Sequence, residues 1–159
     1  MSTTRPKYSF AFAVFPDCEA AKNEYWANEV EVMRLAGSAW TTLAQGKSDE
    51  ALGLMRQAAD MEDKSEKHIV TPARILPARE LLGDMLLELK RPAEALKEYE
   101  ASQLREPNRL RGLYGAGMAA AQSGNKAKAK EYFGRVVSMA GSASPRAELS
   151  NARAYLASN

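Results

Sequence analysis

His68 is the only histidine of the chain and stands in the stretch DKSEKHIVTP, where an imidazole could serve as a general base or a metal ligand. Cys18, the only cysteine, is the candidate nucleophile, but a cysteine–histidine pair also needs a third group that orients the imidazole. No nucleophile signature surrounds either residue, and the sequence has no glycine-rich phosphate-binding loop. The residue types therefore predict a protein that is not an enzyme.

A metal site could draw on the acidic residues around His68, which are Glu62, Asp63 and Glu66. Carboxylate and imidazole groups suit a divalent cation, but a charged run at a helix end usually faces water. We therefore expect no metal and no other cofactor. A small-molecule or metal-binding domain centred on the loop with His68 is the alternative function.

The charge and length of the chain exclude further classes of function. The chain has 159 residues, the length of one domain, and its 22 basic and 20 acidic residues give a formal charge of +2 without a long run of one sign. This pattern predicts no nucleic-acid binding, and no stretch approaches the roughly 18 apolar residues of a membrane span. Arg5 and Lys7 precede the apolar YSFAFAVF, but this core is short for an export signal and lacks a cleavage motif. We expect a cytoplasmic protein, with export as the alternative.

A period of 34 residues organises the second half of the chain. Three pairs of similar residues are 34 positions apart: Gly83 and Gly117, Ala95 and Ala129, and Tyr99 and Phe133. A weaker copy lies in LAGSAWTTLAQGKSDEALGLMRQAADMED, with Ala39 and Ala51 at the small positions. Small residues at fixed spacing let two helices approach closely, so the period indicates repeated helix pairs.

This pattern resembles the tetratricopeptide repeat, a helix-turn-helix unit of 34 residues, over about residues 32–143. The resemblance implies an all-α, right-handed α-solenoid of about three repeats, with a long first helix and a C-terminal capping helix. From about residue 24 to 156 the sequence is also similar to the C-terminal region of longer bacterial tetratricopeptide-repeat proteins of unassigned function.

We expect an N-terminal apolar arm or leader over residues 1–16 and a helical domain over 17–159. Its repeats are predicted at about 32–65, 76–109 and 110–143, with a cap at 144–158. Ala95 follows Ala51 by 44 residues rather than 34, so an insertion is expected at about 66–75. Helix boundaries are assigned from single residues: Ser48 and Asn108 as N-caps, Pro77 and Pro92 as first helical residues, and Gly46 and Gly124 as left-handed ends.

The first helix is expected from about 24 to 45, because apolar and small residues recur there at spacings of 3 and 4: Trp26, Val30, Met33, Gly37, Trp40 and Ala44. We interpret this stripe as core. In the N-terminal arm, bulky residues alternate with small ones, as expected for an extended segment: Tyr8, Phe10, Phe12 and Val14. We expect the arm to pack against the stripe, in its own chain or, in an arm-exchanged homodimer, in a neighbour's.

In helical solenoids the first helices of successive repeats line a concave surface that binds peptides or partner helices. Carrying these positions over to this sequence gives the candidate groove residues: Trp40, Glu80, Asp84, Glu88, Arg111, Tyr114 and Met118. Glu80, Asp84 and Glu88 are four apart and would form an acidic row on one helix face. The alternative is that the row is merely solvated and the aromatic residues pack in the core. The predicted function is a non-catalytic protein–protein interaction module.

Overall fold

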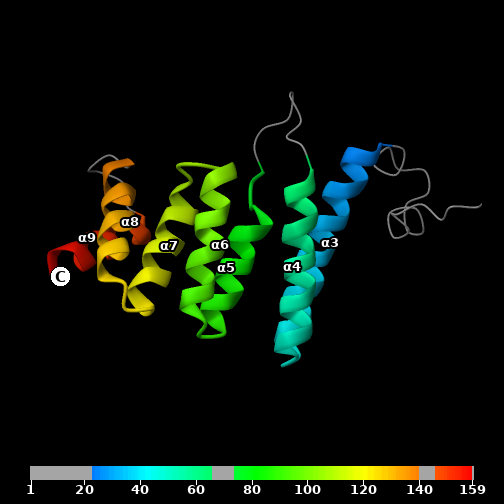
Figure 1. Ribbon diagram of the computed structural model, residues 1–159, viewed down its shortest axis with the longest axis horizontal. Helices are drawn as coiled ribbons and strands as arrows, with labels where there is room; N and C mark the ends of the chain where they lie inside the picture. The colour runs from blue at the N-terminus through cyan, green and yellow to red at the C-terminus, as the bar shows by residue number, and fades with distance from the viewer. Residues whose placement is uncertain (1–22, 66–73, 140–145, 159) are drawn as a thin grey trace, which may run out of the picture. The chain divides into compact units, whose positions relative to one another are not determined.

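The structure, a computed structural model, describes residues 23–65, 74–139 and 146–158, and the regular secondary structure in these ranges is entirely α-helical (Figure 1). The helices are α3 (Glu24–Ala44), α4 (Ser48–Lys64), α5 (Ala78–Glu88), α6 (Pro92–Arg105), α7 (Leu110–Gln122), α8 (Lys126–Met139) and α9 (Ala147–Ser158). The predicted N-terminal arm, Cys18 and His68 lie outside the described residues. The all-α prediction is confirmed.

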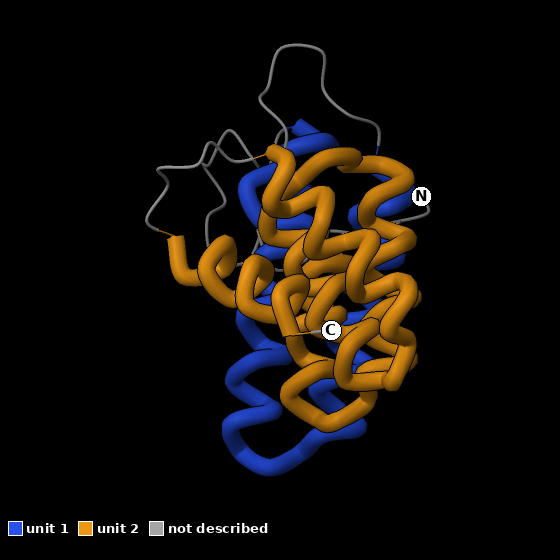
Figure 2. Tube along the Cα trace, turned by 90° about the vertical axis from the view of Figure 1, so that its left-hand side faces the viewer, with its two compact units in different colours: residues 1–78 blue, residues 79–159 orange. Residues whose placement is uncertain are grey.

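The chain divides into two compact units, residues 1–78 and 79–159 (Figure 2). In the described part of the first unit, α3 and α4 form an antiparallel pair (Figure 1). The second unit holds α5 to α9, apart from the first residue of α5, and consecutive helices pack on one another from α6 through α9. No helix among the described residues is long and apolar enough to cross a membrane.

The long first helix is confirmed: α3 spans 21 residues. It begins after Asn23, whose side-chain Oδ1 accepts hydrogen bonds from the backbone N–H groups of Tyr25 at 3.0 Å and Trp26 at 3.4 Å. This capping satisfies two of the backbone donors that a helix start leaves open. The helix therefore begins where the sequence period of the stripe begins.

The prediction that the α3 stripe forms the core is wrong. Met33 is 70% exposed and Trp26 42% exposed, whereas Trp40 is half-buried. The buried face of α3 instead carries smaller residues, and it packs on α4 residues that are small or flexible: Ala27, Val32, Leu35, Ala36 and Ala39 against Ala51, Leu52, Met55, Ala58 and Ala59. Alanines let the two helices come close, and the bulky residues are left on an outer flank of α3.

In the second unit, the 34-residue period corresponds to a repeated close contact. A Cβ atom added to Gly83 would lie 2.8 Å from the ring of Tyr99, and one added to Gly117 would lie 2.7 Å from the ring of Phe133. Cβ atoms do not approach aromatic carbons so closely, so both glycines are needed for their helices to meet. The prediction that small residues mark helix contacts is confirmed.

Three first helices end in the same turn. Gly46, Lys90 and Gly124 all have a left-handed backbone, with φ of 80°, 59° and 80°. In each turn the N–H of this residue bonds to the carbonyl three residues before it, and the next N–H bonds to the carbonyl five residues before it. This is the hydrogen-bond pattern of a helix end closed by a left-handed residue. The assignments of Gly46 and Gly124 are confirmed, and Lys90 takes the corresponding place in the middle repeat.

Two predicted N-caps are wrong. Ser48 is already the first residue of α4, because the Ala51 N–H bonds to the carbonyl of Lys47, one residue earlier. Asn108 has a left-handed φ of 60° and precedes Arg109, the residue before α7. Its side-chain oxygen accepts from Arg135 Nη2 at 3.3 Å rather than from the helix start. Pro92 is the first residue of α6, as predicted, whereas the same assignment for Pro77 is wrong, because α5 begins one residue later at Ala78.

The capping helix at the C-terminus is confirmed as α9, which packs on α8. Its apolar residues Leu149 and Ala152 are completely buried. α9 therefore covers the side of α8 that would otherwise face water, as a terminal helix of a repeat array must.

Candidate functional site

The ring of Tyr99, on α6, lies between two glycines of neighbouring helices, Gly83 on α5 and Gly115 on α7. A Cβ atom added at Gly115 would lie 2.8 Å from the phenolic oxygen and still closer to the ring carbons. Tyr99 itself is completely buried. The two glycines thus make the slot that lets one aromatic side chain pass between α5 and α7.

The hydroxyl of Tyr99 holds a charged pair. It donates a hydrogen bond to Asp84 Oδ1 at 2.6 Å, and Arg111 Nη2 contacts the other carboxylate oxygen of Asp84. Burial, and the nearby Asp84 carboxylate, raise the pKa of Tyr99, so this hydroxyl keeps its proton. The side chain of Arg111 is 53% exposed and that of Asp84 25% exposed. The Asp84–Arg111 pair therefore lies at the surface, and the buried Tyr99 holds it in place.

The charge state of Arg111 is secured by the same contact. Partial burial lowers the pKa of the guanidinium, but the Asp84 carboxylate outweighs it, and the pKa of Arg111 is raised above its ordinary value. Arg111 therefore stays cationic at physiological pH.

Glu80 is fully buried, in contrast to the acidic row expected from its spacing. Its Oε1 accepts from Arg109 Nε at 2.8 Å. Burial raises the pKa of the Glu80 carboxyl, and Arg109 opposes that rise. Asp84 is partly covered by Tyr99 and Arg111, so Glu88 alone of the three carboxylates is exposed. Two of the three acidic residues are therefore paired with arginines: Glu80 with Arg109, the residue before α7, and Asp84 with Arg111 on α7.

Tyr114 and Met118 lie one and two turns beyond Arg111 on α7, and both are half-buried. The ring of Tyr114 packs at 5.8 Å from that of Phe133 on α8, and its hydroxyl accepts a hydrogen bond from Asn151 Nδ2 on α9 at 3.1 Å. Phe133 also packs at 4.9 Å from Tyr155 of α9. Three helices thus fix the ring of Tyr114 while leaving part of it accessible.

Trp40, the remaining predicted groove residue, lies on α3 in the first unit. Within the second unit, the structure brings Asp84 and Arg111 into direct contact and places Tyr114 and Met118 along the same helix as Arg111. Tyr99 and Gly115 complete this site but were not among the predicted site residues. The signal for Tyr99 was present: the position 34 residues later holds Phe133, which has no hydroxyl.

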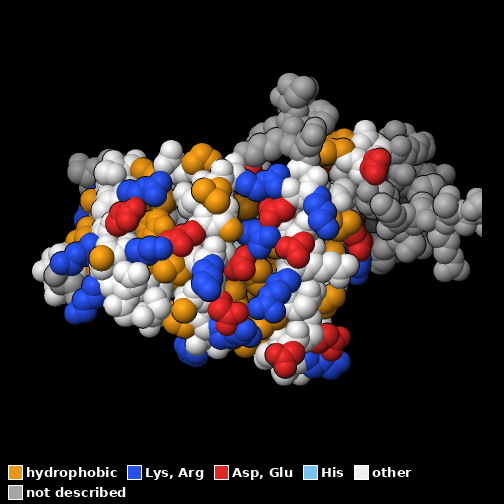
Figure 3. Space-filling view, in the orientation of Figure 1, with side chains coloured by type: hydrophobic (Ala, Val, Ile, Leu, Met, Phe, Trp, Pro, Cys, Tyr) orange, Lys and Arg blue, Asp and Glu red, His pale blue; other side chains and the backbone are white. Residues whose placement is uncertain are grey.

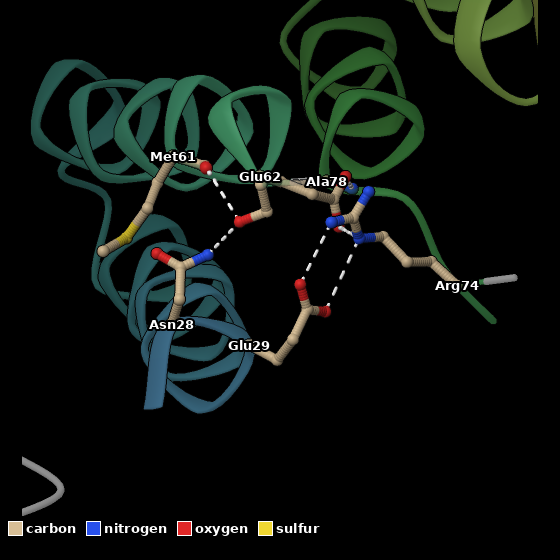
Figure 4. A network of polar contacts seen from close by, with 7 residues as sticks. Asn28, Glu29, Met61, Glu62, Arg74 and Ala78 are labelled. Atoms are coloured by element: carbon tan, nitrogen blue, oxygen red, sulfur yellow. Dashed lines mark hydrogen bonds and ion pairs between the residues drawn. The ribbon is translucent and has the colours of Figure 1, made fainter. Parts of the chain in front are cut away.

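A second polar cluster joins α3, α4 and the start of α5 in the first unit (Figure 4). Arg74 contacts Glu29 at 3.0 Å and Glu62 at 3.3 Å, and all three side chains are nearly buried. Glu62 Oε2 accepts from the backbone N–H of Ala78 at 2.8 Å, so it caps α5 from another helix. Nearby, Asn28 donates to the hydroxyl of Ser65. This cluster anchors both ends of the predicted insertion.

The cluster does not resemble a metal centre. Burial raises the pKa of Glu62, and the Ala78 N–H and Arg74 oppose that rise. Arg74 is itself held cationic, since the two carboxylates outweigh the effect of burial on its pKa. No group of three or more metal-binding side chains occurs among the residues that the structure describes.

The first unit also has an open hollow of about 990 Å³ between α3 and α4. Its walls are partly polar and partly apolar, and they include Tyr25, Asn28, Arg56, Gln57, Asp60 and Met61. None of the predicted groove residues lines it. On the molecular face shown in Figure 3, acidic and basic side chains are interspersed over the described helices, with apolar side chains between them. That distribution is unlike the one-sign stripe of a nucleic-acid interface.

Comparison with known proteins supports the same fold. The sequence model of the tetratricopeptide repeat matches residues 110–142, which hold α7 and α8. No curated protein sequence matches the chain. The right-handed sense of the solenoid stays a prediction.

Three solved structures of similar fold are of PcrH. One is PcrH from Pseudomonas aeruginosa, with a TM-score of 0.60 and 20% identity over 80% of this chain and 89% of that one. For PcrH in complex with the chaperone binding region of PopD, the TM-score is 0.63 and the identity 22%, over 82% of this chain and 91% of that one. For PcrH in complex with the chaperone binding region of PopB, the TM-score is 0.60 and the identity 23%, over 79% of this chain and 94% of that one. At these identities the likeness establishes a tetratricopeptide-type helical repeat fold.

Proposed function

We propose that this chain is a non-catalytic protein-interaction module that binds an extended peptide or a partner helix on the α5–α7 face of its second unit. The observation that carries the proposal is the Tyr99–Asp84–Arg111 arrangement. A buried hydroxyl holds Asp84, and Asp84 holds a guanidinium that is half exposed. Exposed arginines usually sample many conformations, and ordering one in advance lowers the entropy cost of binding a partner.

The neighbouring surface of α7 suits the apolar part of such a partner. Tyr114 and Met118 are partly accessible and follow Arg111 at helical spacing. Arginine and aromatic residues are enriched at the energetic centres of protein interfaces, and methionine adapts to different apolar side chains. The similar fold of PcrH, which is known in complex with the chaperone binding regions of PopD and PopB, supports a peptide or protein as the class of partner.

The proposed face consists of Asp84, Glu88, Arg111, Tyr114 and Met118. Glu80 is left out, because it is buried against Arg109. Trp40 is kept as a separate candidate contact of the first unit. A homodimer formed by exchange of the N-terminal arm also stays a prediction; sedimentation velocity of the full chain and of a variant lacking residues 1–16 tests it.

The test is selection of random dodecapeptides displayed on phage against the immobilised full chain, followed by calorimetric titration of the selected peptides. Arg111→Ala and Tyr114→Ala should each weaken binding about tenfold or more, as expected for interface residues of these types. The matched control is Leu104→Ala, because Leu104 is 87% exposed on α6, outside the proposed face. Peptides that bind all three variants with unchanged affinity would exclude this face.

A further inference from the structure

The apolar stripe of α3 is not used in the packing of α3 on α4. Met33 is 70% exposed, and Val30 and Trp40 are half-buried. At 3.6 residues per turn, the positions from Trp26 to Trp40 fall within an arc of about 80° and span about 21 Å along the helix axis. An apolar row of this length on a helix flank marks an interaction site.

Gly37 stands in the middle of this row and has no packing role there. A Cβ atom added to it would meet no atom within 4 Å. A glycine inside a helix weakens the helix, and its use is to let another group approach the backbone. Gly53 and Gly134 are similarly open, so the glycine alone is not diagnostic. Gly37 differs because it leaves a gap in an apolar row, between Met33 and Trp40.

We propose that this stripe is the docking site of the chain's own residues 8–15, YSFAFAVF. Four of the five bulky residues of that segment alternate with small ones, so an extended backbone presents these four on one face: Tyr8, Phe10, Phe12 and Val14. At about 3.3 Å per residue, the distance from Tyr8 to Val14 is about 20 Å, which matches the length of the stripe. If Tyr8 lies at the Trp40 end, Phe10 falls near Gly37, where the missing side chain leaves room for a ring.

Chain length also sets the direction of docking. Eight residue steps separate Phe15 from Asn23, the residue before α3, and they span at most about 27 Å when fully extended. Parallel docking would place Phe15 beside Trp40, about 26 Å along the axis from Asn23, and would leave no slack. Antiparallel docking places Phe15 beside Trp26 and needs only a reversal, for which Pro16 and Asp17 are suited. The arm therefore runs antiparallel to α3, with Tyr8 near Trp40.

This inference does not rest on the proposed function, because the stripe lies in the first unit and the peptide-binding face in the second. It also differs from the arm-exchanged dimer, in which the same contact would come from another copy. The occupant assigned here is the segment of the same chain.

The sequence offers two probes for the test. The only two tryptophans, Trp26 and Trp40, mark the two ends of the stripe, and the only cysteine is Cys18. In the full chain carrying Cys18→Ser and Ser9→Cys, a nitroxide spin label attached at position 9 sits on the small-residue side of the arm. The proposal expects loss of the Trp40 indole N–H signal in the nuclear magnetic resonance spectrum, with the Trp26 signal retained. Signals are assigned with Trp40→Phe.

Three outcomes overturn the proposal. If both indole signals persist, the arm is not docked. If only the Trp26 signal disappears, the direction is wrong. In a mixing experiment, isotope-labelled chains without a spin label are combined with spin-labelled chains that carry no isotope label. If the Trp40 indole signal then disappears, the arm comes from a second copy.

A pair of variants tests which side of the arm makes the contact. The double variant Phe10→Asp and Phe12→Asp should shift the tryptophan emission of the full chain to longer wavelength, because it places charges against the apolar stripe. Its control, Ser9→Asp and Ala11→Asp, puts the same charges on the other side of the segment and should leave the emission unchanged. Equal shifts in both variants, or none in either, would contradict the docking.

Discussion

Tyr99 Oη lies 2.6 Å from Asp84 Oδ1, and through this contact a residue of the second helix of a repeat fixes a charge on the first-helix face. The two residues are 15 positions apart and belong to α6 and α5. Asp84 in turn contacts Arg111 of the next helix pair. A single buried hydroxyl thus links the packing of the repeat to the orientation of the exposed guanidinium.

The first prediction concerns this hydroxyl. Tyr99→Phe keeps the ring between its two glycines but leaves Asp84 with one partner fewer. We expect a loss of about 1.5 kcal/mol in the free energy of unfolding, the usual value for a hydrogen bond to a charged group, measured by urea denaturation. The affinity for selected peptides should fall as well, because Arg111 loses its anchor.

Tyr132→Phe is the matched control for Tyr99→Phe. The Tyr132 hydroxyl contacts the Glu100 carboxylate at 2.9 Å, on α8 and α6, so the stability loss should be similar. Peptide affinity should not change, because neither residue belongs to the proposed face. Equal peptide affinity in the two variants would disconnect Tyr99 from binding.

A second prediction separates glycines that packing requires from those it does not. Gly117→Ala should destabilise the protein by about 1–3 kcal/mol, because the new methyl group would overlap the ring of Phe133. Gly53→Ala should stabilise it by about 0.5–1 kcal/mol, because alanine favours helix and no atom lies near. Thermal and urea unfolding measure both. A stable Gly117→Ala protein would show that the two helices can move apart at no cost.

The helix pairs and their close contacts could be predicted from the sequence, because the period records which residues meet. Gly83 with Tyr99 and Gly117 with Phe133 are the same contact repeated 34 residues later. The face of α3 could not be chosen correctly from hydrophobicity alone. Its bulky stripe and its alanine-rich face have the same helical period, and close packing on α4 selects the smaller residues.

The polar contacts could not be predicted, because they join residues with no common spacing. Glu29 lies on α3, and Arg74 lies 45 positions later, near the end of the predicted insertion. The spacing of Glu80, Asp84 and Glu88 carried no information about Arg109 and Arg111, which pair with two of them. Pair formation between repeats depends on side-chain length and helix placement, which the period leaves open.

The third prediction is the pH dependence associated with Glu80. Burial raises its folded-state pKa above 4.5, so the folded protein binds a proton more tightly than the unfolded chain does. The stability that Glu80 contributes is therefore fully present below pH 4.5 and is lost as the pH rises through the folded pKa. The free energy of unfolding of the wild type, minus that of Glu80→Gln, should fall over this range. A difference that rises with pH would mean that Arg109 outweighs burial.

The fourth prediction concerns the buried cluster of the first unit. Arg74→Ala leaves Glu29 and Glu62 nearly buried without their shared cation, and removing one partner of such a pair costs about 3–5 kcal/mol. Arg34→Ala is the control, because Arg34 contacts Glu31 one turn away on the same helix, and it should cost less than about 1 kcal/mol. Urea unfolding followed by tryptophan emission reports on this unit, since Trp26 and Trp40 both lie on α3. Equal losses would mean that the cluster is effectively solvated.

The last prediction comes from the turn that closes the first helix of each repeat. Lys90 adopts a left-handed φ of 59° where the other two repeats have glycine. Left-handed backbone costs a residue with a Cβ atom about 1–2 kcal/mol, partly offset because glycine loses more entropy on folding. Lys90→Gly should therefore raise the free energy of unfolding by about 0.5–1 kcal/mol. Gly124→Ala, at the equivalent turn, should lower it by about 1 kcal/mol. If Lys90→Gly instead destabilises the protein, the lysine side chain makes a contact that outweighs the backbone strain.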